Sequence, residues 1–332
     1  MANYVKFIIC SLLKTNYKTM SLITVIIPVY NRVSYLERTF ASLRNQTYRP
    51  FRIILVDNNS NDASLSLCYR LQAENSTDDF RIDVLQELKP GANAARNKGL
   101  KEAVSPWVMF FDSDDELVPD ALQRIADAIE RYPVADVVGF TAWLRFPDGR
   151  MRKKRHCFSV KIEDQIVHTM FSTQCYVART DTIKAIGGWD EDLQAWQDWN
   201  MGIRLLMHTR KVVWLKRPSL VIINRHSDSI TGDFYIDSMS RHEAAIDKTA
   251  TLLAESNYPR KKEYAALAHA RRLFLAGRYR KENNREQGDR MFDTLMQILS
   301  PTIARRKIWR MLYRYVSRGG RGQDIIIRRL IR

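Results

Sequence analysis

The chain has 332 residues, of which 53 are Lys or Arg and 37 are Asp or Glu, so its formal net charge is +16. Apolar residues make up 45% of it, which excludes an intrinsically disordered or collagen-like protein. No apolar run reaches the roughly 20 residues that a membrane-spanning helix needs.

The positive charge is concentrated near the C-terminal end. Residues 241–332 hold 22 basic and 9 acidic side chains, whereas residues 1–240 are nearly neutral. This asymmetry predicts a polyanionic partner for the tail, either nucleic acid or an anionic membrane.

The N-terminal segment and the cysteines bear on the compartment. Residues 1–19 are either an upstream extension of a chain that begins near Met20 or an ordinary amphipathic segment, and no small-residue signal cleavage site follows them. The cysteines lack a C-x-x-C and a partner His at zinc spacing, which favours reduced thiols in a cytosolic protein. They are Cys10, Cys68, Cys157 and Cys175.

Strands and helices are predicted to alternate from Leu22 to Arg131. Near-continuous apolar runs predict the strands Leu22–Val29, Phe51–Val56, Arg81–Leu85 and Trp107–Phe111. Apolar residues at helical spacing predict the helices Val33–Gln46, Ser64–Glu74, Asn93–Ala103 and Pro119–Arg131. The alternation predicts an α/β fold with parallel strands and helices on both faces of the sheet.

The alternation ends after Val138. Two strand-like runs around Pro147-Asp148-Gly149 predict a hairpin within Phe140–Arg155. The later segments are predicted as a loop at Gly187–Asp190, a helix at Trp196–Met207, a strand-like run at Lys211–Asn224 and helices from Ser238 onward.

Polar residues follow the three strongest strands, at Tyr30–Arg32, Asp57–Asp62 and Asp112–Glu116. The carboxyl ends of parallel strands meet at one edge of a sheet, where such folds bind ligands. We therefore expect a polar ligand that spans this edge. Neither G-x-G-x-x-G nor G-x-x-x-x-G-K-[ST] follows the first strand, which argues against a dinucleotide site and a P-loop.

Asp112-Ser113-Asp114 places two carboxylates at the end of a buried strand. Carboxylate oxygens suit Mg²⁺ or Mn²⁺, which typically take one or two carboxylates together with substrate phosphates. The alternative is capping of the helix that begins near Pro119. The pattern favours metal binding.

Asp198 lies between two tryptophans at the start of a predicted helix. A partly desolvated carboxylate there would have a raised pKa and could act as a general base. The alternative is that Asp198 has no catalytic role and simply complements the positive N-terminal end of the helix.

The stretch from Ile23 to Arg225 resembles a family 2 glycosyltransferase of the GT-A fold. The segments that carry this resemblance are ITVIIPVYNR, IILVDNNSNDAS, GANAARNKGL, WVMFFDSDDEL, GGWDEDL and WQDWNMGIRL. The resemblance implies a Rossmann-like mixed sheet flanked by helices, with a helical C-terminal extension. The implied domains are an N-terminal extension at 1–20, a catalytic domain at 21–237 and a basic helical region at 238–332.

The resemblance also implies roles for particular residues. Pro28, Tyr30 and Asp57 would hold the nucleoside, with Asp57 on the base, and Arg96 would lie near the base or the diphosphate. Asp112 would approach the ribose and the metal, and Asp114 would ligate the metal. Asp198 would be the catalytic base. His226 matches a position that can approach the metal or the diphosphate, and is otherwise an ordinary surface histidine.

Three positions depart from the family pattern. Arg32 and Asn58 stand where an acid is frequent, and Gln197 replaces the acid that often precedes the base. The first two leave the identity of the nucleotide open.

The resemblance thus implies a metal-dependent, inverting transfer of a sugar from a nucleotide-diphosphate sugar, here a UDP-sugar, to a saccharide or lipid-linked acceptor. The expected context is surface polysaccharide or glycolipid synthesis. The alternatives are a nucleotidyltransferase, which usually has a Gly-rich loop after the first strand, and a non-catalytic membrane-associated adaptor on this fold.

The tail holds a basic amphipathic helix. Ile308, Leu312, Tyr315 and Val316 are expected on one face, Arg306, Arg310 and Arg314 on another, with Trp309 and Tyr313 beside them. Such a helix suits an anionic membrane surface, or else it packs on its own protein. We expect a cytoplasmic enzyme held on the inner face of the cell membrane. No nucleic-acid recognition module is visible. The run Arg152–His156 either adds to the basic surface or is a solvated hairpin.

Overall fold

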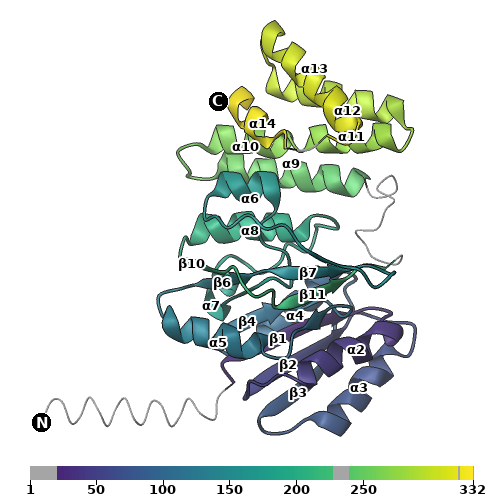
Figure 1. Ribbon diagram of the computed structural model, residues 1–332, viewed down its shortest axis with the longest axis vertical. Coiled ribbons are helices and arrows are strands. Elements are labelled where there is room, and N and C mark those ends of the chain that lie inside the picture. Colours follow the sequence, from purple (N-terminus) through teal and green to yellow (C-terminus); the bar gives the residue numbers. More distant parts are fainter. Residues whose placement is uncertain (1–20, 227–238, 321, 332) are drawn as a thin grey trace, which may run out of the picture. The chain divides into compact units, whose positions relative to one another are not determined.

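The computed structural model describes residues 21–226, 239–320 and 322–331 (Figure 1). The chain divides into two compact units. The described parts of unit 1 are residues 21–160, 171–191 and 204–226, and those of unit 2 are residues 161–170, 192–203 and the chain from 239 onward. The expected N-terminal extension at 1–20 and the domain border at 237 lie outside the described residues.

Unit 1 is built on a mixed sheet of seven strands in the order β10-β6-β9-β4-β1-β2-β3. The strands are β1 (Ile23–Val29), β2 (Phe51–Asp57), β3 (Phe80–Gln86), β4 (Trp107–Phe110), β6 (Val137–Phe140), β9 (Tyr176–Arg179) and β10 (Val212–Leu215). Strands β3, β2, β1 and β4 are parallel, and β9 runs antiparallel to both β4 and β6. The α/β fold with a mixed sheet is therefore confirmed.

A second sheet of four strands has the order β5-β11-β7-β8. Its strands are β5 (Glu116–Leu117), β7 (Ala142–Arg145), β8 (Met151–Lys153) and β11 (Val221–Asn224). Strands β7 and β8 form the hairpin predicted around Pro147-Asp148-Gly149. The strand-like run Lys211–Asn224 contains two strands, β10 of the large sheet and β11 of the small one.

Helices cover both faces of the large sheet. The helices of unit 1 are α2 (Val33–Arg44), α3 (Ser64–Asn75), α4 (Ala92–Glu102), α5 (Ala121–Arg131) and α7 (Thr180–Ala185). Residues from α2, α3 and α5 share one apolar cluster with alternate residues of β1 and β2. On the opposite face, α4 lies so close to the sheet that a Cβ on Gly99 would meet Ile26 Cγ2 at 2.5 Å. This glycine allows α4 to bring its side chains to the ends of the central strands.

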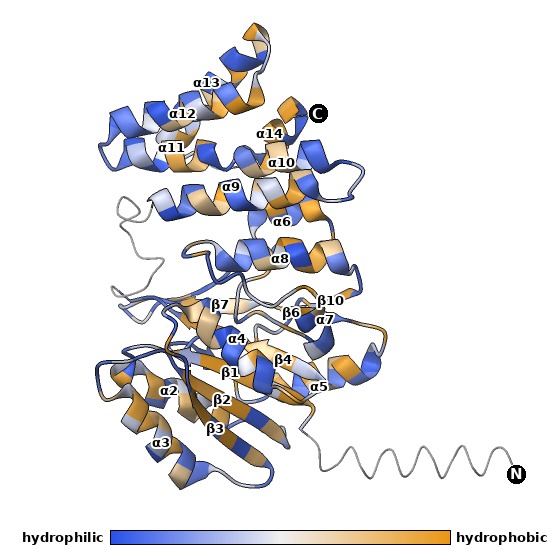
Figure 2. Cartoon of the chain, turned by 180° about the vertical axis from the view of Figure 1, so that it is seen from behind, coloured by the Kyte–Doolittle hydropathy of each residue, from blue (hydrophilic) through white to orange (hydrophobic). Residues whose placement is uncertain are grey.

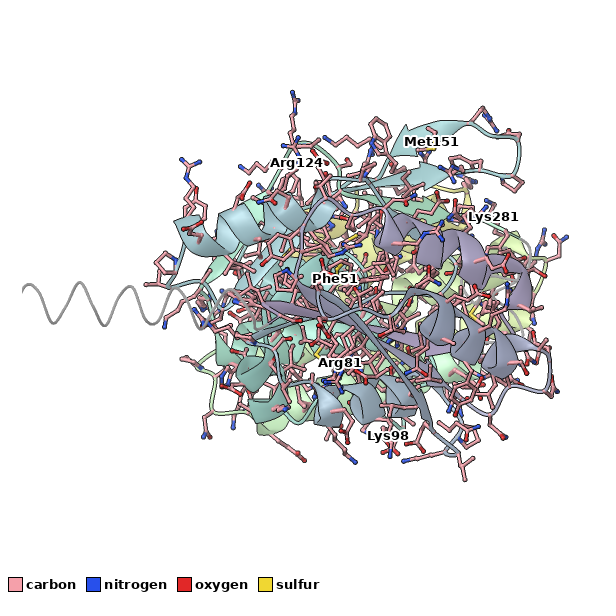
Figure 3. All side chains as sticks on the ribbon, turned by 90° about the horizontal axis from the view of Figure 1, so that it is seen from below. Phe51, Arg81, Lys98, Arg124, Met151 and Lys281 are labelled. Carbon is pink, nitrogen blue, oxygen red and sulfur yellow. The ribbon has the colours of Figure 1, made fainter. Side chains whose placement is uncertain are left out.

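Burial follows the alternation read from the sequence. Figure 2 shows β1 and β2 as largely hydrophobic strands, and every residue of β1 is buried. Phe51 in β2 is fully buried, whereas Arg124 on α5 and Met151 on β8 are exposed (Figure 3). The sheet therefore supplies the rigid core of unit 1, and its strand ends supply the polar groups.

Unit 2 is helical, as predicted for the tail. It contains α6 (Ile162–His168), the first residues of α8 (Gln197–His208), and the helices α9 (Met239–Glu255), α10 (Lys261–His269), α11 (Arg272–Lys281), α12 (Arg285–Leu299), α13 (Ile303–Ser317) and α14 (Asp324–Ile331). Among the described residues, no helix combines the length and the hydropathy required to cross a bilayer.

The predicted apolar face of α13 needs a correction. Trp309, Leu312, Tyr313 and Val316 are the buried residues of this helix, whereas Ile308 and Tyr315 are exposed. The buried face packs inside unit 2, with the Tyr313 ring stacked on Phe292 of α12 at 4.7 Å and Val316 against Gly277 of α11. The alternative of a helix packed on its own protein thus holds for this face.

Candidate active site

The carboxyl ends of β1 and β2 lie side by side, with Val29 opposite Asp57 and Pro28 opposite Val56. Tyr30 follows β1 and is 54% exposed, so its ring is accessible beside this edge. Asp57 is buried, and its Oδ2 accepts a hydrogen bond from the Ser60 backbone N–H at 3.2 Å. Its Oδ1 is buried without a hydrogen-bond partner among the described residues, which leaves one acceptor for a ligand donor.

The Asn58 side chain holds the loop that follows β3 through three hydrogen bonds. Its amide donates hydrogen bonds to the carbonyls of Glu87 and Lys89 at 2.9 and 2.7 Å, and its Oδ1 accepts from the Gly91 N–H at 2.7 Å. A carboxylate could accept from Gly91 but could not donate to either carbonyl. Position 58 departs from the family pattern, and its amide has a structural role because it donates the two hydrogen bonds that hold this loop.

Arg96 and Asp112 form an ion pair where α4 meets the end of β4. Arg96 Nη2 lies 3.0 Å from Asp112 Oδ1, Nη1 donates to Asn93 Oδ1 at 3.0 Å, and the guanidinium lies over the Trp189 ring at 4.6 Å. The Asn93 amide donates to the Asp190 carbonyl at 2.6 Å. The GANAARN and GGWDEDL segments thus meet around one buried arginine.

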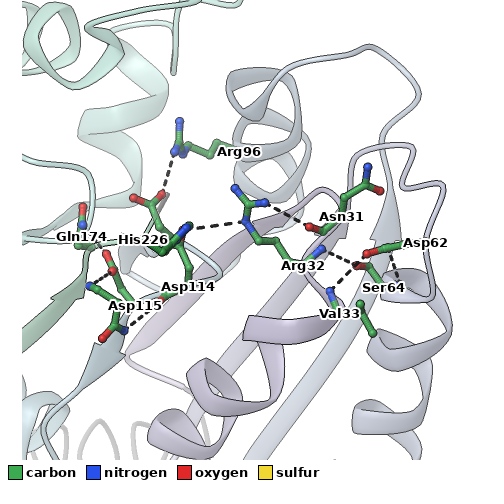
Figure 4. A network of polar contacts seen from close by, with 12 residues as sticks. Asn31, Arg32, Val33, Asp62, Ser64, Arg96, Asp114, Asp115, Gln174 and His226 are labelled. Atoms are coloured by element: carbon green, nitrogen blue, oxygen red, sulfur yellow. Dashed lines mark hydrogen bonds and ion pairs between the residues drawn. The ribbon is translucent and has the colours of Figure 1, made fainter. Parts of the chain in front are cut away.

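Asp114 pairs with His226 and Arg32 (Figure 4). The two carboxylates of the D-x-D therefore have different partners. His226 Nε2 lies 2.9 Å from Asp114 Oδ2, and the imidazole stacks on the Tyr35 ring of α2 at 4.5 Å. Arg32 Nε lies 3.9 Å from the same oxygen. His226 is therefore part of the site and is not an isolated surface histidine.

Asp115 is the buried anchor of this turn. It accepts hydrogen bonds from the Asn224 backbone N–H at 2.9 Å and from the Gln174 amide. Burial raises the pKa of its carboxyl well above the ordinary value, and repulsion from Asp112 and Asp114 adds to the rise. Asn224 also donates through its side chain to the Asp114 carbonyl at 2.7 Å, so the turn is held from β11.

The side chains present fit a divalent cation at Asp114. In the described part of the chain, no group of three or more His, Cys, Asp or Glu residues is arranged around a metal position. Two such ligands are adjacent, Asp114 and His226, while Asp112 faces Arg96. One carboxylate with substrate phosphates is an ordinary set for Mg²⁺, and an imidazole beside it also suits Mn²⁺.

Asp198 belongs to unit 2, in the first turn of α8. Its Oδ1 accepts from the Trp199 N–H at 2.8 Å. The guanidinium of Arg271 lies 4.1 Å from the Trp196 ring centroid and 4.6 Å from that of Trp199. Trp196 has a φ of 48°, an unusual conformation for a bulky residue. The helix start that carries Asp198 is thus held by aromatic and cationic side chains.

Sequence analysis did not identify several residues that build this site. Gln174 and Asn224 are single polar residues in segments without a motif, and they reach the site only through the fold. Trp189 lies in GGWDEDL, but the sequence indicated only a loop there and no role for its ring. Asn93 could have been predicted, because it lies one helical turn before Arg96 and so on the same face of the predicted helix.

Comparison with known proteins gives a consistent result. Residues 24–183 match the family model described as glycosyl transferase family 2. Glycosyltransferase GlyA of Streptococcus pneumoniae is 26% identical over 76% of this chain and 38% of that protein. The amylovoran biosynthesis glycosyltransferase AmsB of Erwinia amylovora is 27% identical over 77% of this chain and 91% of that protein. The chain spans 34–41% of the length of the first four curated relatives that it matches.

Solved structures show the same fold. Staphylococcus aureus TarS 1–349 in complex with UDP-GlcNAc has a TM-score of 0.63 at 19% identity, covering 90% of this chain and 91% of that one. The mannosyltransferase PcManGT of Pyrobaculum calidifontis, in complex with GDP-Man and Mn²⁺, has a TM-score of 0.56 at 16% identity, covering 90% and 86%.

The role of Asp115 can be tested by two substitutions. Asp115→Ala leaves the buried Asn224 N–H and the Gln174 amide unpaired, so we expect a loss of about 1–3 kcal/mol in the free energy of unfolding. Asp115→Asn retains an acceptor for Asn224, and we expect a smaller loss. Urea denaturation measures both, and equal losses would contradict this account.

The stability of the wild-type protein and that of Asp115→Asn should also depend differently on pH. Because the pKa of Asp115 is raised in the folded state, the wild-type protein keeps this proton to higher pH than the unfolded chain does. Its contribution to stability is therefore present at low pH and declines as the pH rises from about 4 through the folded-state pKa. We expect Asp115→Asn to lack this part of the decline.

Proposed function

Residues 24–183 form a family 2 glycosyltransferase domain, and we propose that the chain transfers a sugar from a nucleoside-diphosphate sugar to an acceptor hydroxyl, with inversion at the anomeric carbon. The observation that carries the proposal is the sheet edge where β1, β2 and β4 end. It combines an unpartnered buried acceptor on Asp57 with the Arg96–Asp112 and Asp114–His226 pairs. We assign the Asp57 acceptor to the nucleoside, the Arg96–Asp112 pair to the ribose and the Asp114–His226 pair to the diphosphate.

We propose a UDP-sugar as the donor, supported by the TarS complexes with UDP and UDP-GlcNAc. Asp57 Oδ1 would accept a hydrogen bond from the imide N–H of the uracil ring, and Pro28 and Tyr30 would border the nucleoside. Arg96 would hold Asp112 toward the ribose and the cation. Because these groups come from rigid strand ends and α4, the donor would be oriented with little rearrangement.

A divalent cation, Mn²⁺ or Mg²⁺, would be held by Asp114 and His226 together with the diphosphate, and it would offset negative charge that grows on the leaving group. The Mn²⁺ complex of PcManGT supports the use of a divalent cation.

Asp198 would act as the general base. It removes the proton of the acceptor hydroxyl as that oxygen attacks the anomeric carbon opposite the leaving diphosphate. One displacement of this kind inverts the anomeric centre and requires no nucleophile from the protein. The Trp196, Trp199 and Arg271 stack would keep the first turn of α8, and so Asp198, in one orientation.

The acceptor would be a saccharide or lipid-linked saccharide in surface polysaccharide or glycolipid synthesis. Two relatives support this: AmsB, named for amylovoran biosynthesis, and a Campylobacter jejuni glucosyltransferase named for a PP-undecaprenol substrate, which is 36% identical over 32% of this chain and 34% of that protein.

We also propose that unit 2 contacts an anionic membrane on the cytoplasmic side, through the outer face of α13. The exposed residues of this face are Ile303, Lys307, Arg310, Met311, Arg314 and Tyr315. Ile303 is 80% exposed and Met311 is 68% exposed, so apolar and basic side chains alternate on it. Such a surface suits anionic headgroups and the boundary of the acyl chains.

The donor site can be tested with a panel of UDP, GDP and their sugars, titrated with and without Mn²⁺. We expect UDP to bind tightly only with Mn²⁺, and Asp114→Asn to lose this metal-dependent increase. Asp120→Asn, which changes an exposed acid paired with Arg124, is the control. Unchanged metal-dependent affinity in Asp114→Asn would refute the assignment.

The base can be tested by Asp198→Asn. Since general-base catalysis contributes about 10²–10⁴-fold, we expect transfer to fall by that factor while UDP affinity stays within about twofold. Asp192→Asn, an exposed acid of the same unit, should leave both quantities unchanged. Retained transfer by a homogeneous preparation of Asp198→Asn would refute the role of Asp198.

The membrane surface can be tested by flotation with vesicles that contain phosphatidylglycerol. Each basic residue near an anionic surface contributes about 1 kcal/mol, so the triple variant K307Q/R310Q/R314Q should bind about 10²-fold more weakly. The variant K101Q/R124Q/R131Q removes the same charge from α4 and α5. Equal losses in the two variants would show that net charge, rather than α13, determines binding.

A further inference from the structure

An imidazole and a guanidinium approach the same oxygen of Asp114. His226 Nε2 lies 2.9 Å from Oδ2 and Arg32 Nε lies 3.9 Å from it, and all three side chains are less than one-fifth exposed. In the described site each carboxylate of the D-x-D therefore has its own arginine, Arg96 on Asp112 and Arg32 on Asp114.

The backbone of Arg32 is fixed by the loop that follows β2 (Figure 4). Its N–H donates to Ser64 Oγ at 2.7 Å, and the next N–H, of Val33, lies 3.4 Å from Asp62 Oδ2. Its carbonyl accepts from the backbone N–H groups of Tyr35 and Leu36 in the first turn of α2. The side chain is thus presented to the site from a rigid position. Its Nη1 donates to the Asn31 carbonyl at 3.2 Å, and the long stem allows the guanidinium to exchange its Asp114 contact for another.

A divalent cation on Asp114 changes the partner that Arg32 prefers. A cation held by Asp114 would repel the Arg32 guanidinium, whose Nε lies 3.9 Å from the same carboxylate oxygen. The diphosphate that arrives with the cation offers new oxygen acceptors, and a guanidinium pairs with phosphate oxygens through two parallel hydrogen bonds.

We propose that Arg32 is an exchangeable donor-binding residue. It pairs with Asp114 when the site holds neither cation nor donor, and it moves to the diphosphate oxygens when both bind. This proposal rests on the proposed function, and it gives the departure at position 32 a chemical role. The arginine competes with the metal alone but assists the metal–nucleotide complex.

The proposal predicts opposite changes in two affinities, which a merely structural role would not produce. In Arg32→Gln, Mn²⁺ without nucleotide should bind about threefold to tenfold more tightly, because a competing charge is absent. With saturating Mn²⁺, UDP should bind about tenfold more weakly, because a charged hydrogen-bond partner is lost. Arg32→Lys should give intermediate values for UDP.

Free Mn²⁺ measured by electron paramagnetic resonance gives the first affinity, and calorimetry with UDP gives the second. Arg38→Gln is the matched control, because Arg38 lies on α2, pairs with Glu116 at 3.2 Å and carries the same charge. It should change neither affinity. If Arg32→Gln shifts both affinities in the same direction, or shifts neither, the proposal is overturned. Absence of UDP binding by the wild-type protein would instead refute the proposed function.

Discussion

The buried carboxyl of Asp115 is the constraint on which the rest of the site depends. It joins the turn after β4 to the backbone of β11 through Asn224 and to the segment before β9 through Gln174. With Asp115 turned inward, its neighbours Asp112 and Asp114 are free to face Arg96 and His226. A buried carboxyl is costly unless its partners are complete. The protein therefore keeps one acid in the interior so that two others are presented at the sheet edge.

Charge balance then organises the edge itself. Three acids lie within four residues, at positions 112, 114 and 115, and mutual repulsion would spread them unless cations stood nearby. Arg96 comes from α4 and Arg32 from the start of α2, so two separate elements supply the positive charge, and His226 beyond β11 adds a polar partner for Asp114. The excess positive charge of the chain lies mainly elsewhere, beyond residue 240. The tail charge and the site charge thus lie on different parts of the chain.

Much of the fold was predictable because its signals are local. The runs at 22–29, 51–56 and 107–111 are apolar enough to be buried on both faces, and their observed bounds differ from the predicted ones by a residue or so. The site was predictable where a motif carried it, as at Asp112 and Asp114. Gln174 and Asn224 were not predictable, because only the packing of β9 and β11 brings these isolated residues to Asp115. In α13 the spacing of apolar residues is compatible with more than one buried face. Contacts with α11 and α12 select the face that contains Trp309 and Tyr313, and they leave Ile308 and Tyr315 exposed.

Two of the three departures from the family pattern, at positions 32 and 58, have different physical meanings. At Asn58 the change from acid to amide supplies two donors that hold the β3–α4 loop, so the position has become part of the scaffold. At Arg32 the change reverses the sign of a charge that lies 3.9 Å from the Asp114 carboxylate. An acid there would add to the negative field that draws in a cation, whereas an arginine pairs with the carboxylate and, in the proposed exchange, would turn to the phosphates. A departure from the family pattern can therefore hold a loop at one position and change the charge of the ligand site at another, and only the partners of each side chain distinguish the two.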